Sequence, residues 1–172
     1  MSVLWIGVVA LLILVPMAVE ARTSTRHERR LRARGAIEPA GDVHALMRVA
    51  YPGAFLLMLA EALWQQRVPV AAATGGTILF FAAKALKYAA IAALGDRWSF
   101  RVLVLRDVPL IATGPYRMLG HPNYVAVVGE LVGAALMLGA VRTGPVALVV
   151  FLPLLVARIR IENAALGRGR SS

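Results

Sequence analysis

Five long apolar runs, separated by arginine-rich segments, constrain the fold of this chain more than any other feature. A membrane-spanning helix needs about 20 mostly apolar residues. The stretches that approach this length are residues 3–19, 49–64, 68–94, 124–141 and 145–161. Hydrophobic residues make up 59% of the chain and charged residues only 16%, which is too apolar a composition for a single aqueous core. The sequence therefore predicts an all-α integral membrane protein with about five transmembrane helices, forming a single membrane domain over residues 1–172.

The positions of the basic residues predict how these helices are oriented. Of the 19 Lys and Arg residues, all but Arg67 and Arg142 fall on segments that five spans would place on one side. Cytoplasmic loops carry an excess of Lys and Arg, so we expect the N-terminus outside and the C-terminus in the cytoplasm. Four or six spans would break this alternation.

The charge and composition also limit the possible partners. The net charge is +10, but the basic residues lie between apolar runs and no nucleic-acid recognition motif accompanies them. We therefore expect contacts with membrane lipids and none with nucleic acid. The chain has no cysteine, and His27, His44 and His121 lack metal-ligand spacing, so no disulfide or metal site is predicted. The oligomeric state stays open.

Four ionisable residues fall in or near the predicted spans, where an unpaired charge is costly. Lys84 and Lys87 lie one helical turn apart near a predicted cytoplasmic end, and we expect them to reach the lipid head groups. Glu61 lies about one turn from the outer end of its span, so an interfacial position and a functional role are both open. Glu130 lies two turns into the fourth span, on the same face as Asn123, and is predicted to point inward.

The longest connection, residues 95–123, is predicted to lie on the cytoplasmic face. Residues 101–105 favour an extended conformation, and residues 108–111 follow a predicted turn at Arg106–Asp107. We therefore expect a short extended segment or hairpin before the fourth span. Long ordered loops commonly carry function.

Two polar clusters flank the last two spans. The first comprises Gly114-Pro115-Tyr116 and Gly120-His121-Pro122-Asn123-Tyr124. Pro122 suits the first turn of a helix, and the residue before a proline avoids helical conformation. The free N–H groups of that helix start could receive a carboxylate; an interfacial anchor formed by the tyrosines is the alternative. The second cluster contains Arg158 and Glu162, which meet on one helical face whether or not they are functional.

Together these clusters resemble the isoprenylcysteine carboxyl methyltransferase family. That family carries a G-x-Y…R-H-P-x-Y element before one span and an R-x-x-x-E-E-x-x-L element after the next. Gly120 stands here in place of the arginine before His-Pro, and Asn163 in place of the second glutamate. Segments 27–38 and 94–105 are similar to a bacterial branch associated with O-methylation of phenolic lipids and alkylpyrones.

The resemblance implies an S-adenosylmethionine-dependent O-methyltransferase in a bacterial inner membrane, with residues 95–123 as the cofactor-binding loop. The residues implied to bind the cofactor are Val108, Pro109, Leu110, Ile111, Tyr116, His121, Pro122, Asn123, Tyr124 and Glu162. Arg158 matches the position assigned to the acceptor. The implied acceptor is lipid-like and enters from the bilayer, carrying a phenol or pyrone hydroxyl or an isoprenylcysteine-type carboxylate. A neutral phenol would need a base, for which His121 and Glu130 are candidates.

Two other classes of function remain open at this point. Sterol-type reductases share a similar G-x-Y…H-x-N-Y element but use NADPH. A non-enzymatic transporter or scaffold would depend instead on Glu61, Lys84, Lys87 and Glu130. The element from Arg158 to Leu166 favours the methyltransferase over the reductase.

Overall fold

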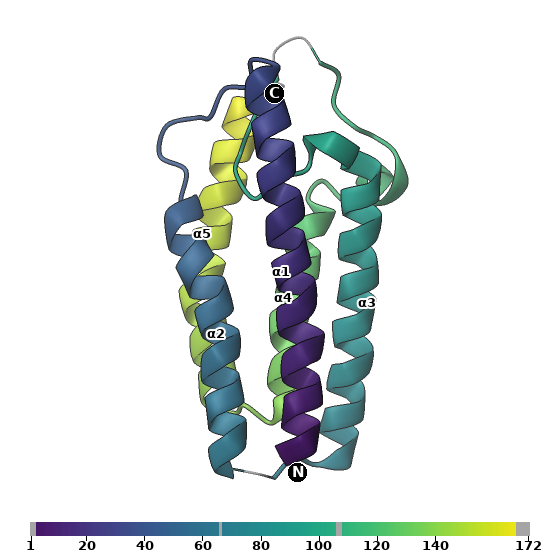
Figure 1. Ribbon diagram of the computed structural model, residues 1–172, viewed down its shortest axis with the longest axis vertical. Helices are drawn as coiled ribbons and strands as arrows, with labels where there is room; N and C mark the ends of the chain where they lie inside the picture. Colours follow the sequence, from purple (N-terminus) through teal and green to yellow (C-terminus); the bar gives the residue numbers. More distant parts are fainter. Residues whose placement is uncertain (1–2, 66, 106–107, 168–172) are drawn as a thin grey trace.

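The structure is a computed structural model that describes residues 3–65, 67–105 and 108–167. Its helices run alternately up and down in chain order (Figure 1). They are α1 (Val3–Ala33), α2 (His44–Gln65), α3 (Val70–Leu94), α4 (Pro122–Leu138) and α5 (Thr143–Ala165). Among the described residues, four helices are long and apolar enough to cross a membrane, and α4 is a shorter apolar helix. The predicted class, an all-α integral membrane protein, is confirmed.

The bundle is apolar both inside and outside, as a lipid solvent requires. Large side chains from several helices fill its core, including Phe55, Phe80, Leu131 and Phe151. Equally large apolar side chains face outward, and they include Leu11, Leu57, Ile78 and Val149. An aqueous surface would not favour this outer layer, whereas hydrocarbon chains solvate it without cost.

Glycines bring α3 and α4 into close contact. A Cβ atom at Gly76 would lie 2.4 Å from the backbone nitrogen of Met137, and one at Gly133 would lie 2.7 Å from that of Phe80. Only glycine fits at such distances, and small residues of this kind are typical of close helix pairs in membranes. Gly129 lies on the same face of α4 as Gly133 and also meets α3, where a Cβ atom would lie 2.9 Å from that of Ala83.

Helix α1 is much longer than its apolar run. The prediction ended this span at Val19, but the helix continues to Ala33. Its polar half buries Glu20, Ser24 and Leu31 along one face, at a spacing typical of a helix packed on one side. The buried residues here are mostly polar, so an apolar pattern could not reveal this extension.

The start of α4 agrees with the local sequence pattern. Pro122 is the first helical residue, and His121 before it has a non-helical φ of −138° and ψ of 64°. The helix ends at Leu138, where Gly139 adopts a left-handed conformation with φ 65°. Such a glycine is a common helix terminator.

The connection between α3 and α4 is extended, and its pairing partner comes from elsewhere in the chain. It contains two short 3₁₀ helices, η1 (Gly95–Arg97) and η2 (Gly114–Arg117). Val104 forms an isolated antiparallel bridge with Ile37, which follows α1. The described residues contain no strand. Of the two predicted forms of this connection, they therefore show the extended segment and not the hairpin. The predicted turn at Arg106–Asp107 lies outside the described residues.

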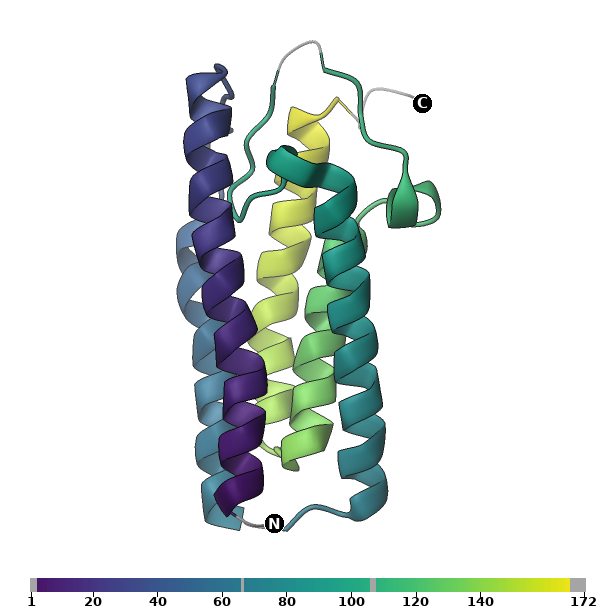
Figure 2. The same cartoon turned by 45° about the vertical axis from the view of Figure 1, so that its right-hand side comes forward.

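The two ends of the bundle differ in character. The connection after α1, the long connection after α3 and the C-terminal end of α5 gather at one end, and the short connections lie at the other (Figure 2). At the short-loop end, Glu61 accepts hydrogen bonds from the backbone nitrogens of Arg142 at 3.0 Å and Thr143 at 2.7 Å. Glu61 therefore satisfies the free N–H groups at the start of α5, which is a structural role.

Candidate active site

A cavity of about 360 Å³ lies at the long-loop end of the bundle. Its walls come from all five α-helices together with the connection after α3. Apolar side chains such as Met17, Met47 and Phe151 line part of it, and polar side chains from α4 and α5 line another part. This size lies in the range of roughly 300–1,000 Å³ typical of small-molecule sites, which usually combine an apolar wall with a few polar groups.

The two polar clusters predicted from the sequence meet in the cavity wall. The Tyr124 hydroxyl on α4 donates a hydrogen bond to a Glu162 oxygen on α5. The ring of His121 stacks on that of Tyr124 with centroids 5.4 Å apart, and its Nε2 lies 2.9 Å from Oδ1 of Asn163. His121, Tyr124 and Glu162 all line the cavity. Asn163, which stands where the family has a second glutamate, therefore orients His121.

Arg158 lines the same cavity but is already fully engaged by the protein. Its Nε donates to the Tyr124 hydroxyl at 3.1 Å, its Nη1 to Oδ1 of Asp42 at 2.7 Å, and its Nη2 to the carbonyl oxygen of Phe100. The side chain is 4% exposed, and a buried guanidinium requires such partners. Arg158 therefore links α5 to α4, to the connection between α1 and α2, and to the connection between α3 and α4.

The remaining predicted cofactor-binding residues lie in the cavity wall with one exception. Val108, Pro109, Leu110, Ile111, Tyr116 and Asn123 all line it. The carbonyl of Pro109 accepts a hydrogen bond of 2.7 Å from Arg97, which helps to hold the extended stretch in place. Pro122 is not part of the lining and is the first residue of α4; its contact with a cofactor stays a prediction.

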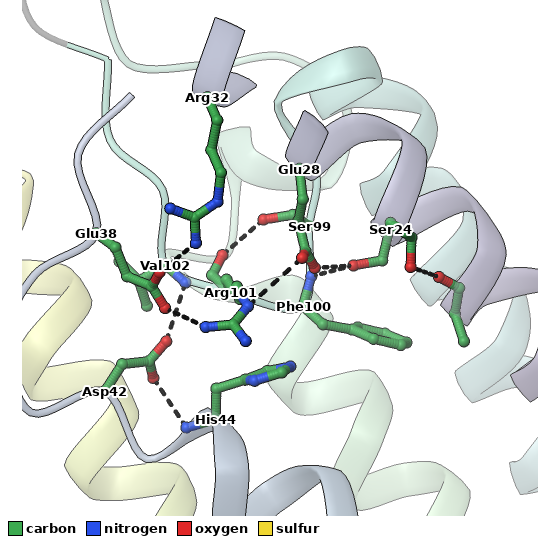
Figure 3. Close-up of polar contacts among 12 residues, drawn as sticks. Ser24, Glu28, Arg32, Glu38, Asp42, His44, Ser99, Phe100, Arg101 and Val102 are labelled. Atoms are coloured by element: carbon green, nitrogen blue, oxygen red, sulfur yellow. Dashed lines mark hydrogen bonds and ion pairs between the residues drawn. The ribbon is translucent and has the colours of Figure 1, made fainter. Parts of the chain in front are cut away.

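A network of ion pairs fixes the connections above the cavity (Figure 3). Nη1 of Arg101 lies 2.6 Å from Oε1 of Glu38, and its Nε lies 3.5 Å from Oε2 of Glu28. Partial burial raises the pKa of Glu38, but the hydrogen bonds and charges of Arg101 and Arg32 outweigh it, so that pKa lies below its ordinary value. Asp42 accepts from the backbone nitrogens of His44 at 3.1 Å and Val102 at 3.2 Å.

Glu130 does not line the cavity, which corrects its prediction as a catalytic residue. Its carboxylate is buried between two lysines, with Oε2 3.0 Å from Nζ of Lys84 and Oε1 3.3 Å from Nζ of Lys87. Glu20 pairs with the same lysines at 2.8 and 2.7 Å. The expectation that Lys84 and Lys87 reach the head groups is also wrong, because both ammonium groups are buried among these carboxylates. Glu130 does point inward, as predicted.

Two buried polar atoms on cavity-lining residues lack a hydrogen-bond partner among the described residues. They are Oδ1 of Asn123, an acceptor, and Nε1 of Trp98, a donor. Buried polar groups are normally satisfied, so such atoms point to a ligand that completes them. Since Glu162 and Asn123 line the same cavity, the site offers oxygen acceptors for the ammonium and hydroxyl groups of an amino-acid-bearing nucleoside. The residues present therefore fit S-adenosylmethionine.

Fold and site together define a helical membrane protein with a polar and apolar cavity built from its last two helices and its longest connection. Residues 76–168 match the model of the isoprenylcysteine carboxyl methyltransferase (ICMT) family. This match covers more than half of the chain and includes both polar clusters, so the chain belongs to that family. Membership implies an S-adenosylmethionine-dependent methyltransferase at a membrane.

Two bacterial relatives extend the likeness over most of the chain. The uncharacterized protein YpbQ of Bacillus subtilis is 29% identical over 155 residues, which cover 90% of this chain and 92% of the relative. An uncharacterized protein of Haemophilus influenzae is 27% identical over 144 residues, covering 83% and 84% respectively. No solved structure gives a significant match.

Sequence reasoning missed several residues that the structure brings to the site. Asp42 is the ion-pair partner of Arg158, although the two lie 116 positions apart in the sequence. His44 and Arg48 line the cavity, and no motif marks them; Trp98 also lines it and lies in segment 94–105, which carries the resemblance but was given no role. Asp42 could have been suspected on one ground: it is one of two acids, with Glu38, between α1 and α2, and a buried arginine needs an acidic partner.

Proposed function

We propose that this protein transfers a methyl group from S-adenosylmethionine to an oxygen of a lipid-like acceptor, at the cytoplasmic face of a bacterial inner membrane. The observation that carries the proposal is the meeting of Tyr124 and Glu162 in the wall of a cavity that Asn123, with its unsatisfied Oδ1, also lines. Family membership gives the reaction class. The apolar part of the cavity supports an acceptor with a long hydrocarbon portion.

Each polar residue has a distinct part in holding the cofactor. Glu162 and Asn123 would accept hydrogen bonds from ammonium or hydroxyl groups, while His121 and Tyr116 flank them. The Tyr124 hydroxyl, held between Arg158 and Glu162, fixes the direction of the Glu162 carboxylate. Residues 108–111 would supply backbone contacts. When bound, the cofactor supplies an electrophilic methyl group on sulfur.

The protein would then contribute to the reaction by aligning the acceptor oxygen with the methyl group and by excluding water. The reacting oxygen and the methyl carbon need to be held about 3–3.5 Å apart in line with the breaking bond. The cavity is lined by all five α-helices and the connection after α3, which would limit the access of bulk water to the reacting atoms. An acceptor tail fits the apolar wall of Met17, Met47 and Phe151, so the acceptor would arrive from the bilayer and the cofactor from the cytoplasm.

Cofactor binding is the first test of this proposal. Purified protein in detergent would be titrated by calorimetry with S-adenosylmethionine and S-adenosylhomocysteine, with NADPH as the competing ligand class. We expect wild type to bind both methyl-cofactor forms, and Glu162→Ala to weaken binding at least about tenfold, because a charge-assisted hydrogen bond is lost. Tyr124→Phe should weaken it less, since it removes only the group that orients Glu162.

Tyr88→Phe is the matched control, because Tyr88 is an exposed tyrosine on α3 that does not line the cavity. It should bind as wild type does. Well-folded wild type that binds neither methyl-cofactor form would contradict the proposal. Binding of NADPH instead would indicate a reductase, and binding of none of the three ligands a transporter or scaffold.

A further inference from the structure

Methylation of a neutral hydroxyl needs a group that removes its proton, and the two residues predicted for this role are not available. The His121 ring is stacked on Tyr124 and bonded to Asn163 at the cofactor end of the cavity. Glu130 lies outside the cavity lining and is neutralised by Lys84 and Lys87. A proton acceptor for the substrate must therefore come from another part of the wall.

His44 is the cavity-lining imidazole that remains. It is the first residue of α2, and Asp42 fixes its position by accepting a hydrogen bond from its backbone nitrogen at 3.1 Å. The side chain is half-buried and extends to the same side as the Phe100 ring (Figure 3). Among the described residues, its ring makes no hydrogen bond that would occupy its nitrogens. It is thus a base with access to both the cavity and water.

Arg48 lies one helical turn beyond His44, so the two side chains share a face of α2. Both line the cavity. The other cavity-lining cations are bound by the protein: Lys87 by Glu20, Arg97 by the Pro109 carbonyl, Arg101 by Glu38 and Arg158 by Asp42. Arg48 has no ion pair or hydrogen bond within the described part of the chain, and its positive charge is left for a ligand.

Resting on the proposed function, we infer that His44 and Arg48 form the acceptor subsite, in which His44 removes the proton of a phenol or enol hydroxyl and Arg48 stabilises the resulting oxyanion. Such a subsite serves a neutral hydroxyl rather than a carboxylic acid, which is already ionised near neutral pH. A carboxylate acceptor would have no use for a base in this position.

The step balances without any further reactant. The O–H bond of the acceptor breaks and its proton passes to the imidazole of His44. The oxygen forms a bond to the methyl carbon while the carbon–sulfur bond of the cofactor breaks, and that electron pair stays on sulfur. The imidazolium then gives its proton to water, which reaches the half-buried ring of His44 when the product leaves.

The surroundings of His44 suit a ring that carries more than one oxygen. Charged groups of Arg101, Arg158, Asp42 and Glu28 act on His44 from four other segments. The indole Nε1 of Trp98 is a buried donor without a partner among the described residues, in the same cavity. A second hydroxyl or a ring carbonyl of the acceptor would satisfy it, as the ring of a resorcinol or pyrone can.

The test compares two acceptors of equal tail length in lipid nanodiscs: an alkylresorcinol and a thioether carboxylic acid. We expect wild type to methylate the alkylresorcinol, and His44→Gln to lower kcat about 100-fold, the contribution typical of a general base. Added imidazole should partly rescue His44→Ala. Arg48→Gln should raise the KM for the alkylresorcinol about tenfold. Calorimetric affinity for S-adenosylmethionine should be unchanged in all three variants.

A second readout does not depend on turnover. The ultraviolet spectrum of the bound alkylresorcinol, followed against pH with S-adenosylhomocysteine present, should show that the phenol ionises at lower pH in wild type than in Arg48→Gln, because the guanidinium stabilises the oxyanion. Arg26→Gln is the control for loss of one exposed basic charge at the same end of the bundle, because Arg26 does not line the cavity. It should leave both the KM and the spectrum unchanged.

Three outcomes would overturn this inference. The first is an unchanged rate on the alkylresorcinol in His44→Gln. The second is a wild type that binds S-adenosylmethionine but methylates only the carboxylic acid or neither acceptor, which leaves the proposed function standing. The third is an equal rise in KM in Arg26→Gln and Arg48→Gln, which would assign Arg48 to lipid head groups. Failure of wild type to bind S-adenosylmethionine would instead reject the proposed function.

Discussion

Four buried charges beside the cavity show how single residues hold the helices of this protein together. Glu20 comes from α1, Lys84 and Lys87 from α3, and Glu130 from α4, so the cluster connects three helices. The Tyr51 hydroxyl on α2 donates a hydrogen bond of 2.6 Å to Glu130, so the cluster also contacts a fourth helix. The two acids and two bases are balanced in charge, which is the condition under which ions persist in a low-dielectric interior.

Removing one member of this cluster should cost more stability than removing a pair. Lys87→Met leaves two buried carboxylates with one lysine, and we expect a loss of about 3–5 kcal/mol in the free energy of unfolding. The double variant Lys87→Met with Glu20→Gln restores neutrality and should recover part of that loss. Thermal and denaturant unfolding in detergent would measure both. A single variant as stable as wild type would show that the cluster is not ionised as described.

At the scale of the element, the pairing of α3 with α4 positions one side of the site. The two helices approach so closely that glycine is required where they cross, at Gly76 and Gly133. Since α4 begins at Pro122 and carries Tyr124 in its first turn, any displacement of α4 against α3 moves the cofactor end of the cavity. Packing in the membrane interior is thus coupled to the geometry at the bundle end.

Neighbouring glycines on α3 provide a matched test of this packing. Gly76→Ala would place a Cβ atom 2.4 Å from the Met137 nitrogen, whereas a Cβ at Gly75 meets nothing within 4 Å. We expect Gly76→Ala to lower the free energy of unfolding by about 1–3 kcal/mol or more through overpacking. Gly75→Ala should be neutral, or stabilising by about 0.5–1 kcal/mol from the removal of a flexible glycine. Equal effects in unfolding experiments would contradict this account of the interface.

At the scale of the whole molecule, the bundle separates two chemical environments. The long connections, the cavity and the ion pairs around Asp42 and Arg101 gather at one end (Figure 2). The distribution of Lys and Arg predicts that this end faces the cytoplasm, where S-adenosylmethionine is made. The orientation and the proposed function therefore depend on each other.

The absence of cysteine from the sequence makes this orientation directly measurable. Single cysteines would be introduced at exposed arginines of the two ends, as Arg34→Cys and Arg142→Cys. In intact bacterial cells, a membrane-impermeant maleimide should label Arg142→Cys and not Arg34→Cys, with both labelled after lysis. Labelling of Arg34→Cys from outside would reverse the predicted topology and place the cavity away from the cytoplasm.

The sequence by itself determined the features that depend on local patterns of residues. Apolar runs of membrane-spanning length predicted the helices, because hydrocarbon solvent leaves a backbone few other choices. Pro122 predicted the start of α4 through its fixed φ and missing N–H. The resemblance of two motifs to one family implied that Tyr124, Arg158 and Glu162 belong to one site.

Only the tertiary structure decided which distant residues satisfy one another. The ion pairs of Asp42 with Arg158 and of Glu20 with Lys84 and Lys87 join segments far apart in the chain, and no periodicity encodes such pairs. The same long-range packing stabilises α1 as far as Ala33. It also places Glu130 outside the cavity lining and His44 in it. The physical reason is that a buried charge is stable only beside its partner, and the partner is chosen by how the helices pack.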